Sequence, residues 1–254
     1  LLMATILNDK LETKLDGVTL AQYGQEVENK FIGVNSGIMD QFAVAMGQPN
    51  TAIFLDTTTL NYQLLPLDLG HYKIVIMNTN KHRNLAESKY NERRSECEQA
   101  CHRLQAIWPI KTLGELTLAQ LDQSTYLLND DTLIRRARHA VSENERTLQA
   151  VNALKQQDLV TFGRLMNASH ISLEYDYEVT GKELNTLAHT AWQQPGVLGA
   201  RMTGAGFSGC ALALVKEDAI PAFIDHVKAR YREEMDYDAD CYVAEIGAGP
   251  RRLV

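Results

Sequence analysis

The chain has 254 residues, enough for one large domain or two of modest size. Apolar residues make up 45% and charged residues 22% of it, a globular composition that excludes disordered, collagen-like and low-complexity proteins. The 25 Lys and Arg residues against 32 Asp and Glu residues give a net charge of −7, which argues against nucleic-acid and anionic-membrane binding. No apolar run approaches the ~18 residues of a membrane-spanning helix, and we expect a cytoplasmic protein.

The first part of the chain is predicted to be helical. Residues 1–8 have the pattern of a helix interior without an N-cap or a polar lead-in, so we expect the chain to begin inside an element of a longer protein. A second helix is expected over residues 21–31. Ser36 is the expected N-cap of a helix over residues 37–46, whose apolar residues follow the period of 3.6.

Strands and long helices alternate in the rest of the chain. Residues 51–56 and 62–67 are predicted to form a hairpin, and residues 73–77 a buried strand. The remaining predicted elements are helices over 87–104, 133–154, 158–169 and 181–194, a strand over 211–215, a helix over 218–235 and a strand over 242–246. This order predicts an α+β fold, a layered sandwich with helices on one face of a sheet. The domain boundary is expected near residues 68–79.

Capping patterns mark two of these helices. Ser142 and Glu145 have the spacing of a capping box, but the apolar stripe runs through them, so we expect one long helix there. Thr180 and Glu183 are predicted to form a true capping box at the start of the helix expected over residues 181–194.

Cysteines and arginines on the helix over residues 87–104 have ordinary structural interpretations. Cys97 and Cys101 lie four residues apart, on one helix face. Because a second close cysteine pair and a histidine at ligand spacing are lacking, we expect buried thiols rather than a zinc site. Arg93 and Arg94 are expected to form a solvated face.

A glycine-rich stretch, Gly204 to Gly209, matches the dinucleotide fingerprint G-x-G-x-x-G. That fingerprint should follow a strand and open a helix, whereas here the glycines are expected to follow a helix and open a strand. We therefore interpret it as a tight turn whose backbone N–H groups could also hold an anion.

Two acidic residues could carry chemistry. Asp40 lies in the first turn of its helix, where the helix dipole favours a carboxylate for structural reasons alone. Its functional interpretation is a general base, with Gly37 letting a small ligand approach closely. Glu28 lies twelve residues earlier, and two carboxylates near one loop can serve one metal and one base.

Taken together, these segments resemble the galactokinases, a family of the GHMP small-molecule kinase superfamily. The resemblance covers nearly the whole chain in the right order, through residues 26–29, 33–41, 78–80, 88–94, 138–144, 169–173 and 199–210. The segments around Gly37-Ile38-Met39-Asp40-Gln41 and Gly199 to Phe207 separate galactokinases from mevalonate and homoserine kinases. The resemblance implies a GHMP kinase fold, with the remainder of an N-terminal domain over 1–72 and a complete C-terminal layered domain over 73–254.

The resemblance also implies roles for individual residues. Asp40 matches the base facing the C1 hydroxyl of galactose, and Gly37 and Tyr90 match positions that contact the sugar. Glu28 matches the acidic partner of Mg²⁺. Gly204 and Gly206 belong to the loop that supports the phosphate end of ATP, in which Ser208 replaces a glycine of many members. The implied reaction is transfer of phosphate from MgATP to galactose.

Two family motifs are lacking from this sequence: a sugar-binding segment resembling GRTNLIGEHxDY and a phosphate loop resembling PxGxGLSSSA. Residues 1–3 match the helix that leaves the phosphate loop. We therefore expect about the first third of a galactokinase to be missing, to be the natural partner of this chain, and to be required for productive ATP binding. Two alternatives remain open: a kinase for N-acetylgalactosamine, and a galactose sensor without catalysis.

Overall fold

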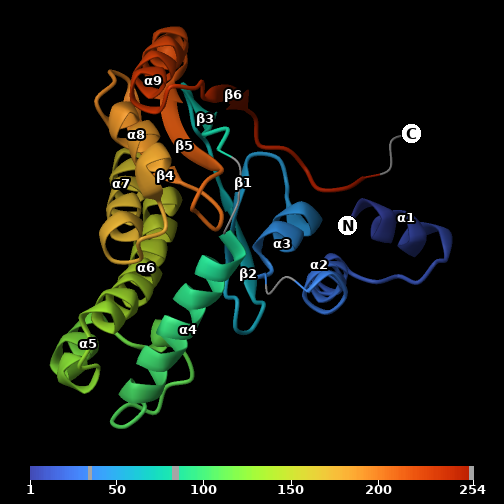
Figure 1. Ribbon diagram of the computed structural model, residues 1–254. Helices are drawn as coiled ribbons and strands as arrows, with labels where there is room; N and C mark the ends of the chain where they lie inside the picture. The colour runs from blue at the N-terminus through green and yellow to red at the C-terminus, as the bar shows by residue number, and fades with distance from the viewer. Residues whose placement is uncertain (34–35, 82–85, 252–254) are drawn as a thin grey trace. The chain divides into compact units, whose positions relative to one another are not determined.

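The structure is a computed structural model that describes residues 1–33, 36–81 and 86–251 (Figure 1). The chain divides into two compact units. Unit 1 comprises Leu1–Asp68 and Glu245–Val254, and unit 2 comprises Leu69–Ala244. The domain boundary at residues 72 and 73 stays a prediction.

Unit 1 is built from short helices and one hairpin. Its helices are α1 (Leu2–Lys10), α2 (Gly17–Glu26), a π-helical turn (Val27–Ile32) and α3 (Met39–Met46). Strands β1 (Thr51–Leu55) and β2 (Tyr62–Pro66) pair antiparallel, which confirms the predicted hairpin. The core of unit 1 is small: Ala21, Ile38 and Phe42 are its buried cluster, and the rings of Phe42 and Tyr62 meet edge to face with centroids 5.4 Å apart.

Unit 2 is built around a four-stranded antiparallel sheet with the order β4-β5-β3-β6. The strands are β3 (Tyr72–Asn78), β4 (Val197–Met202), β5 (Cys210–Lys216) and β6 (Asp240–Ala244). The helices are α4 (Ala86–Leu104), α5 (Leu118–Ser124), α6 (Asp131–Lys155), α7 (Leu159–Tyr175), α8 (Gly181–Trp192) and α9 (Ile220–Met235). Short 3-10 turns lie at Leu113–Glu115, Thr125–Leu127 and Glu217–Ala219.

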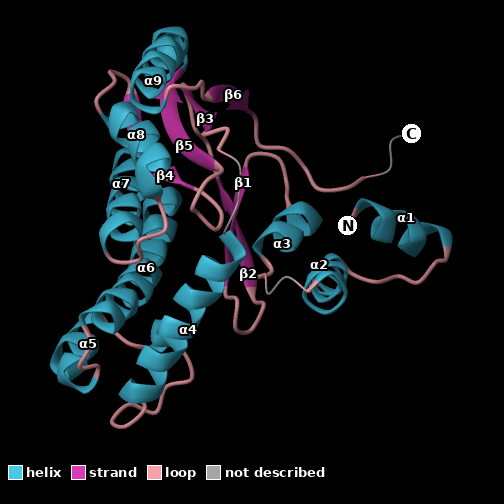
Figure 2. Cartoon of the chain, viewed as in Figure 1, coloured by secondary structure: helices cyan, strands magenta, loops and turns pink. Residues whose placement is uncertain are grey.

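Helices α7, α8 and α9 lie on one side of this sheet, as the layers of Figure 2 show. The main core lies between them and the sheet, and includes Val75, Met77, Ala213, Leu184 and Phe223. Helices α4, α5 and α6 enclose a second core around Leu104, Leu121 and Val141. The predicted α+β sandwich with helices on one sheet face is confirmed, as is the unbroken helix α6. No helix among the described residues has the length and apolarity to cross a membrane.

Strand β4 was not predicted from the sequence. The expectation that the glycine-rich stretch follows a helix is therefore wrong. The glycine-rich stretch does not follow a helix; it joins β4 to β5 as a hairpin loop. The strand escapes a pattern search because Gly199 interrupts its apolar residues and a register shift lies between Val197 and Gly199. Gly199 is required there, since a Cβ at this position would overlap the backbone of Gly163 on α7. The dinucleotide interpretation still fails, because a strand and not a helix follows the glycines.

Two predicted caps are also wrong. Helix α3 begins at Met39 with Ile38 at the N-cap, and the Ser36 hydroxyl donates to the Glu28 carboxylate instead. Thr180 has helical φ and ψ angles, so its hydroxyl makes no cap, and Glu183 pairs with Lys81 at 2.9 Å. The predicted cap at Asp158 is confirmed, because its carboxylate accepts from the Thr161 N–H.

Strand β4 is one edge of the sheet, and side chains cover its outward main-chain groups. Asn167 accepts from the Ala200 N–H at 2.8 Å, and His170 Nδ1 accepts from the Met202 N–H at 3.0 Å. Trp192 Nε1 donates to the Ala200 carbonyl at 2.9 Å. Helices α7 and α8 therefore satisfy the strand groups that a further strand would otherwise pair with.

Candidate functional site

Glu28 lies in the π-helical turn of unit 1 and fastens the segment that leads into α3. The Ser36 hydroxyl donates to Glu28 Oε2 at 2.6 Å, and the Ser36 N–H donates to Asn29 Oδ1 at 3.0 Å. Gln25 donates to the Ser36 carbonyl. π-Helical turns are rare and frequently occur at functional sites. A half-buried carboxylate held in this way is a suitable oxygen ligand for Mg²⁺.

Asp40 lies in the first turn of α3 and is exposed. No hydrogen bond or ion pair joins its carboxylate to another described residue, so it is available to a ligand. Gly37, three residues earlier, is also exposed, and a Cβ built on it would meet no atom of the described residues within 4 Å. The described residues therefore give no packing reason for glycine at residue 37, and its surface is open.

The glycine loop between β4 and β5 is held in a conformation that most residues resist. Gly204, Gly206, Phe207 and Gly209 all have φ between 62° and 89°. A Cβ at Gly206 would overlap the Val179 carbonyl, which accepts the Phe207 N–H at 2.6 Å. Gly204 is exposed with open space around it. Gly206 is thus required by packing, whereas Gly204 leaves its backbone open to a ligand.

Tyr90 of α4 belongs to the same unit as this loop. Its side chain is 36% exposed, and the ammonium of the preceding Lys89 lies 5.7 Å from the centroid of the Phe207 ring. That contact links α4 to the glycine loop. The Ser208 hydroxyl is buried and has no hydrogen-bond partner among the described residues.

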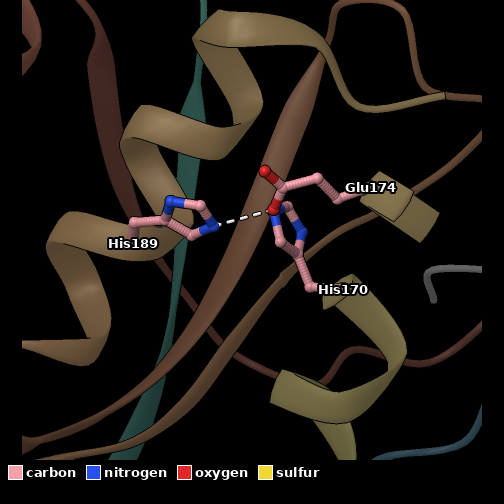
Figure 3. A group of neighbouring side chains, drawn as sticks. All are labelled: His170, Glu174 and His189. Carbon is pink, nitrogen blue, oxygen red and sulfur yellow. Dashed lines mark hydrogen bonds and ion pairs between the residues drawn. The ribbon is translucent and has the colours of Figure 1, made fainter. Parts of the chain in front are cut away.

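Sequence reasoning missed a cluster of His170 and Glu174 on α7 with His189 on α8 (Figure 3). Their ligand atoms lie within 4.8 Å of one another, and His189 Nε2 lies 2.8 Å from Glu174 Oε2. The sequence did contain one indication of it: His170 and Glu174 are four residues apart, which places them on the same face of a helix.

The protonation of His170 argues against a metal in this cluster. Its Nδ1 accepts the Met202 N–H, and burial lowers the pKa of its imidazole to about 4, so the neutral ring carries its proton on Nε2. A metal-bound histidine needs the opposite arrangement, with the metal-facing nitrogen unprotonated and the other donating. We interpret the cluster as a His189–Glu174 pair beside a buried imidazole, His170, that accepts from the backbone of β4.

Two family models match the chain, and both describe the same superfamily. The model for the GHMP kinase N-terminal domain matches residues 1–48, and the model for the C-terminal domain matches residues 150–233. The chain belongs to the GHMP kinases. Among solved structures, a homoserine kinase from Cytophaga hutchinsonii shares this fold with a TM-score of 0.59 at 16% identity.

More similar proteins are galactokinases. The chain is 58% identical to a galactokinase of Lactiplantibacillus plantarum and 59% identical to one of Streptococcus suis, over 253 residues in each case. These alignments cover 100% of this chain and 65% of each relative. The crystal structure of Lactococcus lactis galactokinase complexed with galactose has a TM-score of 0.95 and 53% identity, over 98% of this chain and 64% of that one. The chain thus spans about 65% of the length of the curated relatives it matches.

Proposed function

We propose that the chain is part of a galactokinase, which transfers the terminal phosphate of ATP to the C1 hydroxyl of galactose. The observation that carries this proposal is the identity of about 58% to galactokinases along the whole chain. The galactose complex of the similar Lactococcus lactis enzyme supports the choice of sugar. Because the reaction consumes ATP, we also propose that the protein works in the cytoplasm.

In this proposal Asp40 is the base. Its exposed and unpaired carboxylate accepts the proton of the C1 hydroxyl as that oxygen attacks the phosphate, a role that contributes about 10²–10⁴-fold to a rate. Gly37 and Tyr90 hold the sugar, and Gly204 and Gly206 shape the loop beside the phosphates. Positioning of this kind is the main task of a protein in phosphoryl transfer.

Glu28 is the proposed residue for Mg²⁺. Its carboxylate is a hard oxygen ligand, and the hydrogen bond from Ser36 orients it without neutralising it. When bound, Mg²⁺ supplies charge stabilisation to the transferring phosphate. The remaining ligands, together with the phosphate loop, are proposed to come from a preceding segment of the same protein.

The test compares galactose phosphorylation by the 254-residue chain with that of a fusion carrying the preceding segment of the Lactiplantibacillus plantarum relative. We expect activity only in the fusion, and a loss of about 10²–10⁴-fold in its Asp40→Asn variant. Asp131→Asn is the matched control, because Asp131 is also an exposed first-turn aspartate, on α6. Equal activities of the two variants would show that Asp40 serves only the helix dipole.

A sugar panel on the same fusion separates the alternatives. Preference for galactose over N-acetylgalactosamine supports the proposal, and the reverse preference would replace the substrate. Galactose binding by an inactive fusion would instead favour a sensor.

A further inference from the structure

A buried charge lies at the centre of the helical part of unit 2. Arg136 of α6 is 2% exposed, and its guanidinium donates in three directions. Nε reaches Glu96 Oε2 at 2.7 Å, Nη2 reaches Glu178 Oε2 at 2.6 Å, and Nη1 reaches the Asp176 carbonyl at 2.6 Å. An arginine this deep is stable only when its donors are paired, so the three partners are fixed in place as a set.

One branch of this network leads to α4. Glu96 is 15% exposed and also accepts from Arg93 at 2.7 Å, which corrects the expectation that Arg93 belongs to a solvated face. Tyr90 lies six residues before Glu96 on the same helix. Arg136 therefore fixes the helix that carries the predicted sugar contact.

The other branch leads to the glycine loop. Glu178 has a φ of 56°, a left-handed conformation that is uncommon for a non-glycine residue and carries backbone strain. Here Arg136 and Arg135 both donate to its carboxylate, and the hydrogen bond from Arg136 holds the pKa of Glu178 below its ordinary value. The next residue, Val179, presents its carbonyl to the Phe207 N–H.

Phe207 is the second non-glycine residue with a left-handed backbone at this junction, with a φ of 62°. Two strained residues thus flank a single hydrogen bond, between the Val179 carbonyl and the Phe207 N–H. Such strain persists where the surrounding contacts over-determine the geometry. Phe207 also contacts α4 directly, through the ammonium of Lys89.

We propose that Arg136 is a positioning residue that anchors both α4, and with it Tyr90, and the glycine loop over residues 204–209; by coupling we mean that the two share this one anchor. Glu96 is the link on the α4 side, and Glu178 with Val179 is the link on the loop side. The effect on catalysis rests on the proposed function, in which α4 holds the sugar and the loop supports the phosphates. The coupling itself is a property of unit 2 and needs no ligand.

The coupling is tested by amide hydrogen exchange on the 254-residue chain. Glu178→Gln keeps the shape of the side chain and removes its charge. We expect the Phe207 N–H to exchange at least about tenfold faster in this variant, relative to the buried Val227 N–H of α9 as a reporter of global unfolding. Val141→Ala, a cavity in the core beside α6, is the control for a general loss of stability, and should leave that ratio unchanged. An unchanged ratio in Glu178→Gln would overturn the proposal.

Kinetics of the fusion protein test the catalytic consequence. Glu96→Gln loosens only the α4 branch and should raise the KM for galactose about tenfold, with the KM for ATP little changed. Glu178→Gln loosens only the loop branch and should lower kcat or raise the KM for ATP, with the KM for galactose little changed. Parallel losses in every constant for both variants would mean that Arg136 is merely structural, and would overturn the positioning role. If the fusion proves inactive, the proposed function fails, and the exchange experiment still decides the coupling.

Discussion

The two units of the chain bury very different amounts of apolar side chain. Among the described residues, unit 2 has one buried cluster of 16 residues against its sheet and another of 11 between α4, α5 and α6, whereas the buried cluster of unit 1 holds three. Unit 1 instead exposes large apolar side chains on α1 and around the π-helical turn, among them Leu2, Met3, Leu11, Phe31 and Ile32. Burial of apolar area is the main source of stability, so unit 2 has the core of an independent domain and unit 1 does not.

The predicted site residues divide along the same line. Asp40, Gly37 and Glu28 belong to the weakly packed unit, and Tyr90 with the two loop glycines belongs to the well-packed one. The proposed metal ligand, Glu28, is therefore positioned by local hydrogen bonds such as that from Ser36, and the proposed base, Asp40, is positioned by α3, which packs on the small core of unit 1.

Separate expression of the two units is the strongest test of this difference. We expect residues 69–244 to fold alone with a cooperative thermal transition, and residues 1–68 to remain unfolded even with residues 245–251 supplied as a peptide, because ordering a residue costs about 1–2 kcal/mol of conformational entropy that the few buried apolar side chains of unit 1 cannot offset. Circular dichroism and amide NMR spectra report both outcomes. A cooperative transition in residues 1–68 would contradict the comparison.

A single methyl group tests the packing of unit 2. Gly163 of α7 lies directly against the Leu198 carbonyl of β4, where a Cβ would overlap it. We expect Gly163→Ala to lower the free energy of unfolding by about 3 kcal/mol, measured by urea titration. Gly114→Ala is the control, because a Cβ there would lie 3.8 Å from Asn144, at ordinary contact distance. Similar losses in both variants would mean that the close approach of α7 and β4 is not the cause.

Acid should weaken unit 2 through two buried imidazoles. Burial lowers the pKa of both His139 and His170 from 6.5 to about 4. Between these values the unfolded chain binds protons that the folded chain does not, so each histidine lowers the free energy of unfolding by on the order of 2 kcal/mol as the pH falls from about 6.5 to about 4.

The dependence of stability on pH isolates this effect from any loss of packing. His139→Gln should reduce the slope of unfolding free energy against pH in that window, whatever it does to stability at pH 7. Val141→Ala, which removes packing from the same helix but no titratable group, should leave the slope unchanged. An unchanged slope in His139→Gln would show that burial does not lower the pKa of this imidazole.

The smallest effect on stability is expected at Gly37. Because a Cβ there meets nothing within 4 Å, Gly37→Ala should change the free energy of unfolding by less than about 0.5 kcal/mol. In the fusion protein it should nevertheless weaken galactose binding, by about tenfold in KM, if the sugar lies against this residue. Unchanged stability together with unchanged affinity would remove Gly37 from the proposed site.

Strong periodicity made most of the fold predictable. The helix over Asp131–Lys155 carries its apolar stripe through more than six turns, and the hairpin in unit 1 has two short, largely apolar segments separated by threonines. Capping patterns were less reliable, since Thr180 does not cap its helix whereas Thr112 and Thr117 form capping boxes that were not predicted. The same residue spacing occurs in all of these places, and only the backbone angles of the first residue decide which one caps.

The site was predictable only through resemblance. Nothing in the neighbourhood of Asp40 or Glu28 in the sequence reveals that Ser36 bonds to one of them, because that contact depends on the path of the chain between α2 and α3. Arg136 escaped prediction for the same reason: its partners lie 40 to 42 residues away along the chain. The roles of Asp40, Gly37, Tyr90, Gly204, Gly206 and Glu28 stay predictions.

Because the edge of β4 is covered, the sheet of unit 2 can pair with another chain at only one of its two edges. An incoming chain cannot extend the sheet at β4 without displacing Asn167, His170 and Trp192 from the main-chain groups they satisfy. The opposite edge strand, β6, exposes Tyr242 and Val243, which are 54% and 50% accessible. If copies of this chain polymerise through strand pairing, as partly unfolded β proteins do, growth should begin at β6, and charged residues introduced there should suppress it.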